Sequence, residues 1–146
     1  MRLVLQRVQW GRVSVEGRVI AEINHGLVIL LGIAPSDSEG QARFLAEKVA
    51  HLRIFEDEQG KMNRSVLEVG GSAIVVSQFT LYADARKGRR PSFTDAALPE
   101  QARPLVERFA DLLRAQGVPT QSCQFGAHML VEIANDGPVT IWLEDN

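Results

Sequence analysis

The first third of the chain alternates apolar and polar residues in short runs that are separated by glycine-containing turns. The runs LVLQRVQW, RVSVEG and RVIAEI, between Leu3 and Ile23, keep a two-residue period, and GLVILLGI, from Gly26, is continuously apolar. Alternation is typical of strands with one buried face, and a continuous apolar run is typical of a strand buried on both faces. Gly17 and the Asn24-His25-Gly26 segment supply turns between the runs. We therefore expect the chain to begin as a β-sheet.

Two helices are expected to follow. Ser38 and Gln41 can form a capping box, and the apolar residues after them recur at helical spacing as far as Leu52. A second helix is expected from about Pro99 to Gln116, because this segment has one apolar face and Gly117 follows its end. The remaining strands are expected at residues 53–55, 72–79, 127–134 and 139–144, with a long loop at 80–98. Roughly seven strands with two helices predict a mixed α/β layered domain.

The composition limits the class of protein. A chain of 146 residues fits one domain, residues 1–146, and 45% hydrophobic with 23% charged residues is ordinary for a globular protein in water. No run approaches the ~20 apolar residues of a membrane span, so we expect a cytoplasmic protein that does not contact membranes. Cys123 is the only cysteine and the three histidines are scattered, so we expect no disulfide, no metal site and no cofactor.

A Gly-Pro dipeptide lies within NDGPVT, Asn135 to Thr140, ahead of the last apolar run. Proline lacks an N–H group, and the peptide bond before it reaches the cis form at modest cost, so Gly137-Pro138 can turn neighbouring carbonyl oxygens outward together. Two convergent carbonyl oxygens can accept hydrogen bonds from an ammonium group. The alternative is an ordinary tight turn between two strands.

A second segment, SQFTL from Ser77 to Leu81, follows the apolar run at 73–76. Five further strings accompany these two: LQRV at 5–8, RIF at 53–55, KMN at 61–63, RPSF at 90–93 and FGAHM at 125–129. In their order and rough spacing, the seven strings resemble the D-aminoacyl-tRNA deacylases, the chiral-proofreading enzymes often called DTD. The resemblance covers essentially the whole chain.

The resemblance implies a fold, a substrate and an assembly. The family has two layers of β-sheet with two main helices packed on one side, and the order of elements here is compatible with that fold. The implied substrate is a D-amino acid esterified to the 3′ terminal adenosine of tRNA, and the implied reaction is hydrolysis of that ester. The resemblance also implies a homodimer, in which the Gly-Pro turn of each subunit reaches into the pocket of the other.

Ester hydrolysis needs a water molecule and donors for the oxyanion that develops. Because backbone N–H groups lose their partners where a strand ends, we expect the N–H groups near Gln78 and Phe79 to be these donors. Ser77 and the Gln78 side-chain amide are expected to hold the terminal adenosine. Thr80 offers a rival mechanism as an acyl nucleophile, but no local pattern ties a base to it. The preferred account leaves the neighbouring ribose hydroxyl of the tRNA to help activate water.

Selection of the D isomer follows if the Gly-Pro carbonyl oxygens fix the α-amino group of the substrate while the oxyanion donors fix its ester carbonyl. The side chain of an L-amino acid is then driven against the turn, whereas that of a D-amino acid points to open space. Glycine has no side chain, so glycyl-tRNA is expected to be cleaved too. Phe125 and Met129 are expected at the substrate pocket, with core packing as the alternative, and the resemblance gives Arg7 the role of bracing the Gly-Pro turn.

Two other classes of function stay open. Four basic residues lie between Arg86 and Arg90, and with Phe93 and Tyr82 they are compatible with a non-catalytic RNA-binding module, although the net charge of the chain is −2. The same basic residues are equally compatible with a solvated surface loop. The other class is a self-associating scaffold whose exposed strand edges pair. Cleavage of D-tyrosyl-tRNA, but not of L-tyrosyl-tRNA, by the purified protein would single out the deacylase.

Overall fold

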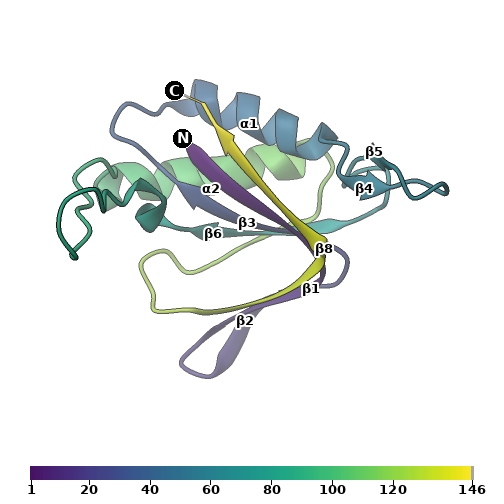
Figure 1. Ribbon diagram of the computed structural model, residues 1–146, viewed down its shortest axis with the longest axis horizontal. Coiled ribbons are helices and arrows are strands. Elements are labelled where there is room, and N and C mark those ends of the chain that lie inside the picture. Colours follow the sequence, from purple (N-terminus) through teal and green to yellow (C-terminus); the bar gives the residue numbers. More distant parts are fainter. Residues whose placement is uncertain (146) are drawn as a thin grey trace.

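A strongly bent β-sheet forms the centre of the computed structural model, which describes residues 1–145 (Figure 1). The elements, in chain order, are β1 (Arg2–Val15), β2 (Arg18–Ile23), β3 (Gly26–Gly32), α1 (Glu39–His51), β4 (Phe55–Glu56), β5 (Met62–Arg64), β6 (Ser72–Ser77), the 3₁₀ helix η1 (Phe79–Tyr82), α2 (Pro99–Ala115), β7 (Thr120–Ser122) and β8 (Leu130–Glu144). The main sheet has the order β2-β1-β3-β6-β7, with β8 paired to β1, and β4 and β5 form a small separate sheet. The mixed α/β class expected from the sequence is confirmed.

The long strand β1 belongs to two layers of the fold. Its first half, from Arg2 to Val8, pairs with β3, and its second half, from Gly11 to Val15, pairs with β2. β8 follows β1 along both halves, so that β2 and the adjoining parts of β1 and β8 form a second layer beneath β3 and β6 in Figure 1. A Cβ atom at Gly11 would lie 2.6 Å from Cγ2 of Val28, so a larger residue at this crossing would push the two layers apart.

Two apolar cores lie on opposite faces of β3 and β6. On one face, Ile29 of β3 lies in a buried cluster with Leu45 of α1 and Phe109 of α2. On the other face, Val28 of β3 lies in a second cluster with Val13 of the bent part of β1. Because neighbouring residues of a strand point to opposite faces, the continuous apolar run of β3 supplies both cores. Both helices cover the same side, which confirms the expected layering (Figure 1).

Both helices lie close to where the sequence predicts them. The N–H group of Gly40 donates to Ser38 Oγ at 3.3 Å, and the N–H group of Ser38 donates to Gln41 Oε1 at 3.0 Å, which completes a capping box at the start of α1. α2 begins at Pro99, which needs no hydrogen-bond acceptor in the first turn. No helix within residues 1–145 is long and apolar enough to cross a membrane.

Several strands differ from the sequence expectations. The runs LVLQRVQW and RVSVEG are one strand, β1, because pairing continues on both sides of Gly11. The strand expected at 72–79 ends at Ser77, since Phe79–Tyr82 form η1. The strand expected at 53–55 is the shorter β4, Phe55–Glu56. Neither β5 nor β7 was expected, because three residues are too few to show a period.

The Gly-Pro segment is a bulge within one strand rather than a turn between two. The strands expected at 127–134 and 139–144 are both parts of β8, and both parts pair with β1. Asn135 is aligned with Val8 and Thr140 with Gln6, so residues 136–139 bulge out opposite Arg7. We call residues 136–139 the Gly-Pro bulge.

Candidate active site

A cavity of about 550 Å³ lies where β6 ends. Its walls come from the end of β6, from residues 96–99 at the start of α2, and from the segment that leads into β8. Among the site residues expected from the sequence, those that line the cavity are Ser77, Gln78, Phe79, Phe125 and Met129. The fold therefore brings the SQFTL and FGAHM strings to one place, although about fifty residues separate them in the chain.

Backbone donors become free at this end of β6. The N–H group of Gln78 donates to the carbonyl oxygen of Leu31 at 2.8 Å, so it is already used by the fold. Within residues 1–145, the N–H groups of Phe79 and Thr80 have no acceptor. Two successive free donors therefore follow the strand, and they lie one residue further along the chain than the pair near Gln78 and Phe79 that the sequence indicates.

The Thr80 hydroxyl is held by its neighbour. The side-chain amide of Gln78 donates a hydrogen bond to Thr80 Oγ1, which has no other hydrogen-bond partner within residues 1–145. An amide does not take up a proton from a hydroxyl group, so this contact does not activate Thr80 as a nucleophile. Thr80 is exposed and is not among the residues that line the cavity.

The Gly-Pro bulge lies away from this cavity in the same chain. Gly137 and Pro138 are exposed, and the peptide bond between them is cis. The bulge faces Arg7 of β1, whereas Ser77 is level with Leu3 of β1, across β3. The bulge and Ser77 are therefore separated by four residues along the strands, about 13 Å, and by three strand spacings across the sheet, about 14 Å. In Figure 1 the bend of β8 lies at the right, and the loop that follows β6 lies at the left.

Arg7 connects the Gly-Pro bulge to the segment ahead of β4. Its side chain is buried, with Nε donating to the carbonyl oxygen of Asp136 at 2.9 Å and Nη1 donating to that of Ile54 at 2.8 Å. Carboxylate oxygens of Glu56 and Asp136 lie 3.6 and 3.7 Å from the guanidinium nitrogens. A buried guanidinium with two carbonyl acceptors fixes the position of the backbone that it contacts.

The Asn135 side chain joins the two ends of the bulge by hydrogen bonds, a role that the sequence did not indicate. Its Oδ1 accepts a hydrogen bond from the N–H group of Val139 at 2.7 Å, and its Nδ2 donates to the carbonyl oxygen of Val139 at 3.0 Å. The same Nδ2 group contacts Gln6 on β1. The preference of asparagine for bonding to backbone a few residues further on is the signal that would have identified it.

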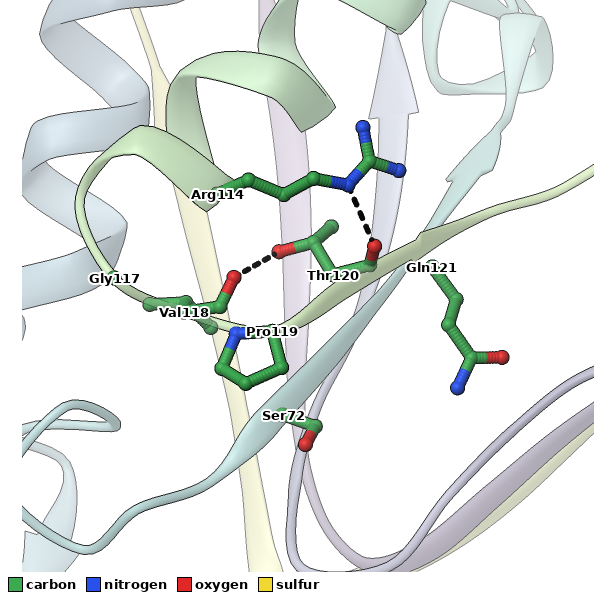
Figure 2. A pocket seen from close by; sticks show the side chains of 7 residues that line it. All are labelled: Ser72, Arg114, Gly117, Val118, Pro119, Thr120 and Gln121. Carbon is green, nitrogen blue, oxygen red and sulfur yellow. Dashed lines mark hydrogen bonds between the residues drawn. The ribbon is translucent and has the colours of Figure 1, made fainter.

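A second cavity, of about 490 Å³, lies between the end of α2 and β7 (Figure 2). Two of its polar side chains are used within the fold, because Arg114 Nε donates to the carbonyl oxygen of Thr120 and Thr120 Oγ1 donates to that of Val118, both at 2.8 Å. No residue expected at the site lines this cavity. Residues 1–145 also contain no group of three His, Cys, Asp or Glu side chains that could hold a metal ion. The cavity at the end of β6 is therefore the candidate active site.

Comparison with known proteins identifies the family that this chain resembles. The model of the family D-Tyr-tRNA(Tyr) deacylase matches residues 4–144. A protein of Thermomicrobium roseum named D-aminoacyl-tRNA deacylase is 62% identical over 144 residues, which are 99% of this chain and 94% of that protein. A protein of Heliobacterium modesticaldum with the same name is 61% identical and matches 99% of this chain and 96% of its own length.

Solved structures share the fold over the whole chain. The structure titled c-Myc DNA unwinding element binding protein has a TM-score of 0.93 at 39% identity, covering 100% of this chain and 99% of that chain. One described as a probable eukaryotic D-amino acid tRNA deacylase has a TM-score of 0.83 at 18% identity, covers 97% of each chain, and shows the likeness of the fold alone. The chain therefore belongs to the D-Tyr-tRNA(Tyr) deacylase family, as the resemblance of its seven strings predicted.

Proposed function

We infer that this protein hydrolyses the ester bond of D-aminoacyl-tRNA and releases a free D-amino acid and tRNA. The observation that carries this function is the pair of free backbone N–H groups, of Phe79 and Thr80, beside the cavity at the end of β6. Water adds to the ester carbonyl, the bond from the carbonyl carbon to the ribose oxygen breaks, and that oxygen takes up a proton. The free N–H groups stabilise the oxyanion formed in between. We also propose that the protein acts in the cytoplasm, where tRNA is charged and used.

The terminal adenosine is held, in this proposal, by Ser77 and the Gln78 amide. The same Gln78 amide donates a hydrogen bond to Thr80 Oγ1. No side chain acts as the nucleophile, and the neighbouring ribose hydroxyl of the tRNA helps to activate water. The absence of a base beside Thr80 within residues 1–145 supports this account over an acyl-enzyme.

We propose that the active unit is a homodimer in which the Gly-Pro bulge of one subunit closes the cavity of the other. The support is that Gly137 and Pro138 of the bulge are exposed and lie far from the cavity of their own chain, while Arg7 and Asn135 hold the bulge in one conformation. The carbonyl oxygens of Gly137 and Pro138 then accept hydrogen bonds from the substrate ammonium group. The L side chain meets the bulge and is excluded, whereas the D side chain points into the cavity toward Phe125 and Met129.

The direct test compares D-tyrosyl-tRNA, L-tyrosyl-tRNA and N-acetyl-D-tyrosyl-tRNA as substrates of the purified protein. Release of labelled tyrosine is expected from the first substrate alone. Loss of each ammonium hydrogen bond costs ~1.5 to 3 kcal/mol, so acetylation should lower binding by about one to two powers of ten per contact. An RNA-binding module without catalysis would bind all three substrates and cleave none, and that result would overturn the assignment.

The dimer has its own test, which mixes two variants of reduced activity. One variant carries Gln78→Ala, and the other carries Pro138→Ala with Gly137→Val, so that one lacks the cavity amide and the other the Gly-Pro pair. If each bulge serves the partner's cavity, a mixed dimer contains one site with both parts intact, and random mixing restores about a quarter of the wild-type activity. Mixtures that are no more active than the sum of their two components would show that the bulge does not act across an interface.

A further inference from the structure

The loop at residues 85–91 stands on the rim of the active-site cavity. Its two arms are joined by an antiparallel bridge, in which the N–H group of Asp84 donates to the carbonyl oxygen of Ser92 and that of Ser92 donates back to Asp84, both at 2.8 Å. The residue that follows the bridge, Phe93, lines the cavity and packs edge-to-face on Phe79, with 5.0 Å between the ring centroids. The position of the loop is therefore tied to the segment that holds the oxyanion donors.

Most of the positive charges of this loop are not compensated within the described chain. Four cations lie between Arg86 and Arg90, and all of them are exposed, although the whole chain has a net charge of −2. Arg86 makes two hydrogen bonds to the Asp84 carboxylate, at 2.8 and 2.7 Å, and these contacts hold the pKa of Asp84 well below its usual range. The charge of Arg86 is therefore used by Asp84, at the start of the loop.

The other three cations, Lys87, Arg89 and Arg90, take part in no ion pair within residues 1–145. Uncompensated cations on an exposed loop are suited to phosphate, because each can replace a condensed counterion of a nucleic acid. We propose that Lys87, Arg89 and Arg90 form a phosphate clamp, which grips the backbone of the tRNA next to its 3′ end while the terminal adenosine occupies the cavity. The proposal rests on the proposed function, since it takes the aminoacyl end of tRNA as the occupant of the cavity.

Such a clamp acts on the encounter with tRNA and not on the ester bond. Phosphate contacts are independent of sequence, so the clamp contributes equally to every charged tRNA. It also explains how an acidic chain can bind RNA, because the favourable potential is confined to the rim of the site.

The test is the triple variant Lys87→Gln, Arg89→Gln, Arg90→Gln, measured with two substrates over a range of salt. Each phosphate contact contributes about −0.7 to the slope of log(kcat/KM) against log[salt] for a single strand, so the slope should become less negative by about 2. Between about 50 and 200 mM salt, the wild-type protein should then lose roughly 20-fold more of its kcat/KM than the variant. The kcat at saturating D-tyrosyl-tRNA should stay unchanged.

The second substrate is adenosine esterified with D-tyrosine, which has no phosphate. Its hydrolysis should be equal in the wild-type protein and the triple variant, and this equality also shows that the variant is folded. A matched control, Arg18→Gln, Arg43→Gln, Lys48→Gln, removes the same number and kinds of charge from β2 and α1 and should keep the wild-type salt slope. An unchanged slope in the loop variant, or an equal loss with the adenosine ester, would overturn the clamp. Wild-type protein that cleaves neither D-tyrosyl substrate would instead overturn the proposed function.

Discussion

The Thr80 hydroxyl distinguishes two mechanisms at the scale of one residue. The only hydrogen-bond partner of Thr80 Oγ1 within residues 1–145 is the Gln78 amide, so we expect Thr80→Ala to keep kcat within about threefold of the wild-type value. Gln78→Ala should lower kcat/KM by about tenfold, because it loses the proposed contact with adenosine. Single-turnover hydrolysis of D-tyrosyl-tRNA measures both. Thr80→Ser is the matched control, since it keeps the hydroxyl. Loss of activity in Thr80→Ala with full activity in Thr80→Ser would favour the acyl-enzyme.

Cys123 should be an unreactive thiol. Burial raises the pKa of the Cys123 thiol to about 11, so the protonated form dominates at neutral pH. We expect alkylation by iodoacetamide to be slow at pH 7 and to rise about tenfold per pH unit until the pH approaches that pKa, because only the thiolate reacts. Mass spectrometry of folded and urea-unfolded protein gives the comparison. Equal rates in the two states would show that the thiol is not shielded by the fold.

At the scale of elements, the bulge in β8 depends on the guanidinium of Arg7. Arg7→Met would leave the carbonyl oxygens of Asp136 and Ile54 without donors, at a cost of about 1–3 kcal/mol each in the free energy of unfolding. We also expect hydrolysis of D-tyrosyl-tRNA to fall by about tenfold or more, because 1.4 kcal/mol of lost positioning corresponds to a factor of ten. Urea unfolding and initial rates check the two effects. Arg7→Lys keeps a charge and a donor, so its stability and activity should lie between those of the wild-type protein and Arg7→Met. A fully stable and active Arg7→Met protein would contradict the bracing role.

The sequence predicted those helices and strands whose residue pattern lies within the element itself. Ser38 and Gln41 mark the start of α1 through their own side chains, and the apolar run of β3 needs no partner to be identified. The extent of β8 could not be predicted in the same way, because the strand is continuous only through its pairing with β1, more than a hundred residues earlier in the chain. A Gly-Pro pair followed by an apolar run is the same local pattern in a hairpin turn and in a bulge.

In the whole molecule, steric exclusion by the Gly-Pro bulge predicts which aminoacyl-tRNAs are hydrolysed. Glycyl-tRNA offers no side chain to collide with the Gly-Pro bulge, so we expect it to be hydrolysed well above the rate for L-tyrosyl-tRNA and within the range of D-aminoacyl-tRNA. Initial rates with glycyl-, D-alanyl- and L-alanyl-tRNA make the comparison at matched size. A rate for glycyl-tRNA no higher than that for L-alanyl-tRNA would show that the filter does not work by exclusion of the side chain.

The site itself was predictable only through the resemblance of the short strings. Neither periodicity nor composition indicates that Phe125 and Met129 face Ser77 across one cavity, because this depends on how β6, α2 and the segment before β8 pack. The separation of Gly137 from that cavity could not be seen in the sequence at all. It follows from the register of four strands across the sheet.

The pairing of β8 on both sides of its bulge also constrains how this family can change in length. Ile141 and Leu143 pack against the core while Trp142 between them is 50% exposed, and this alternation is set by the pairing of residues 140–144 with β1. A one-residue slip of that pairing would turn Trp142 inward and its two neighbours outward. A residue inserted between Asn135 and Thr140 should therefore be taken up within the Gly-Pro bulge, where it changes the substrate filter and leaves the core intact.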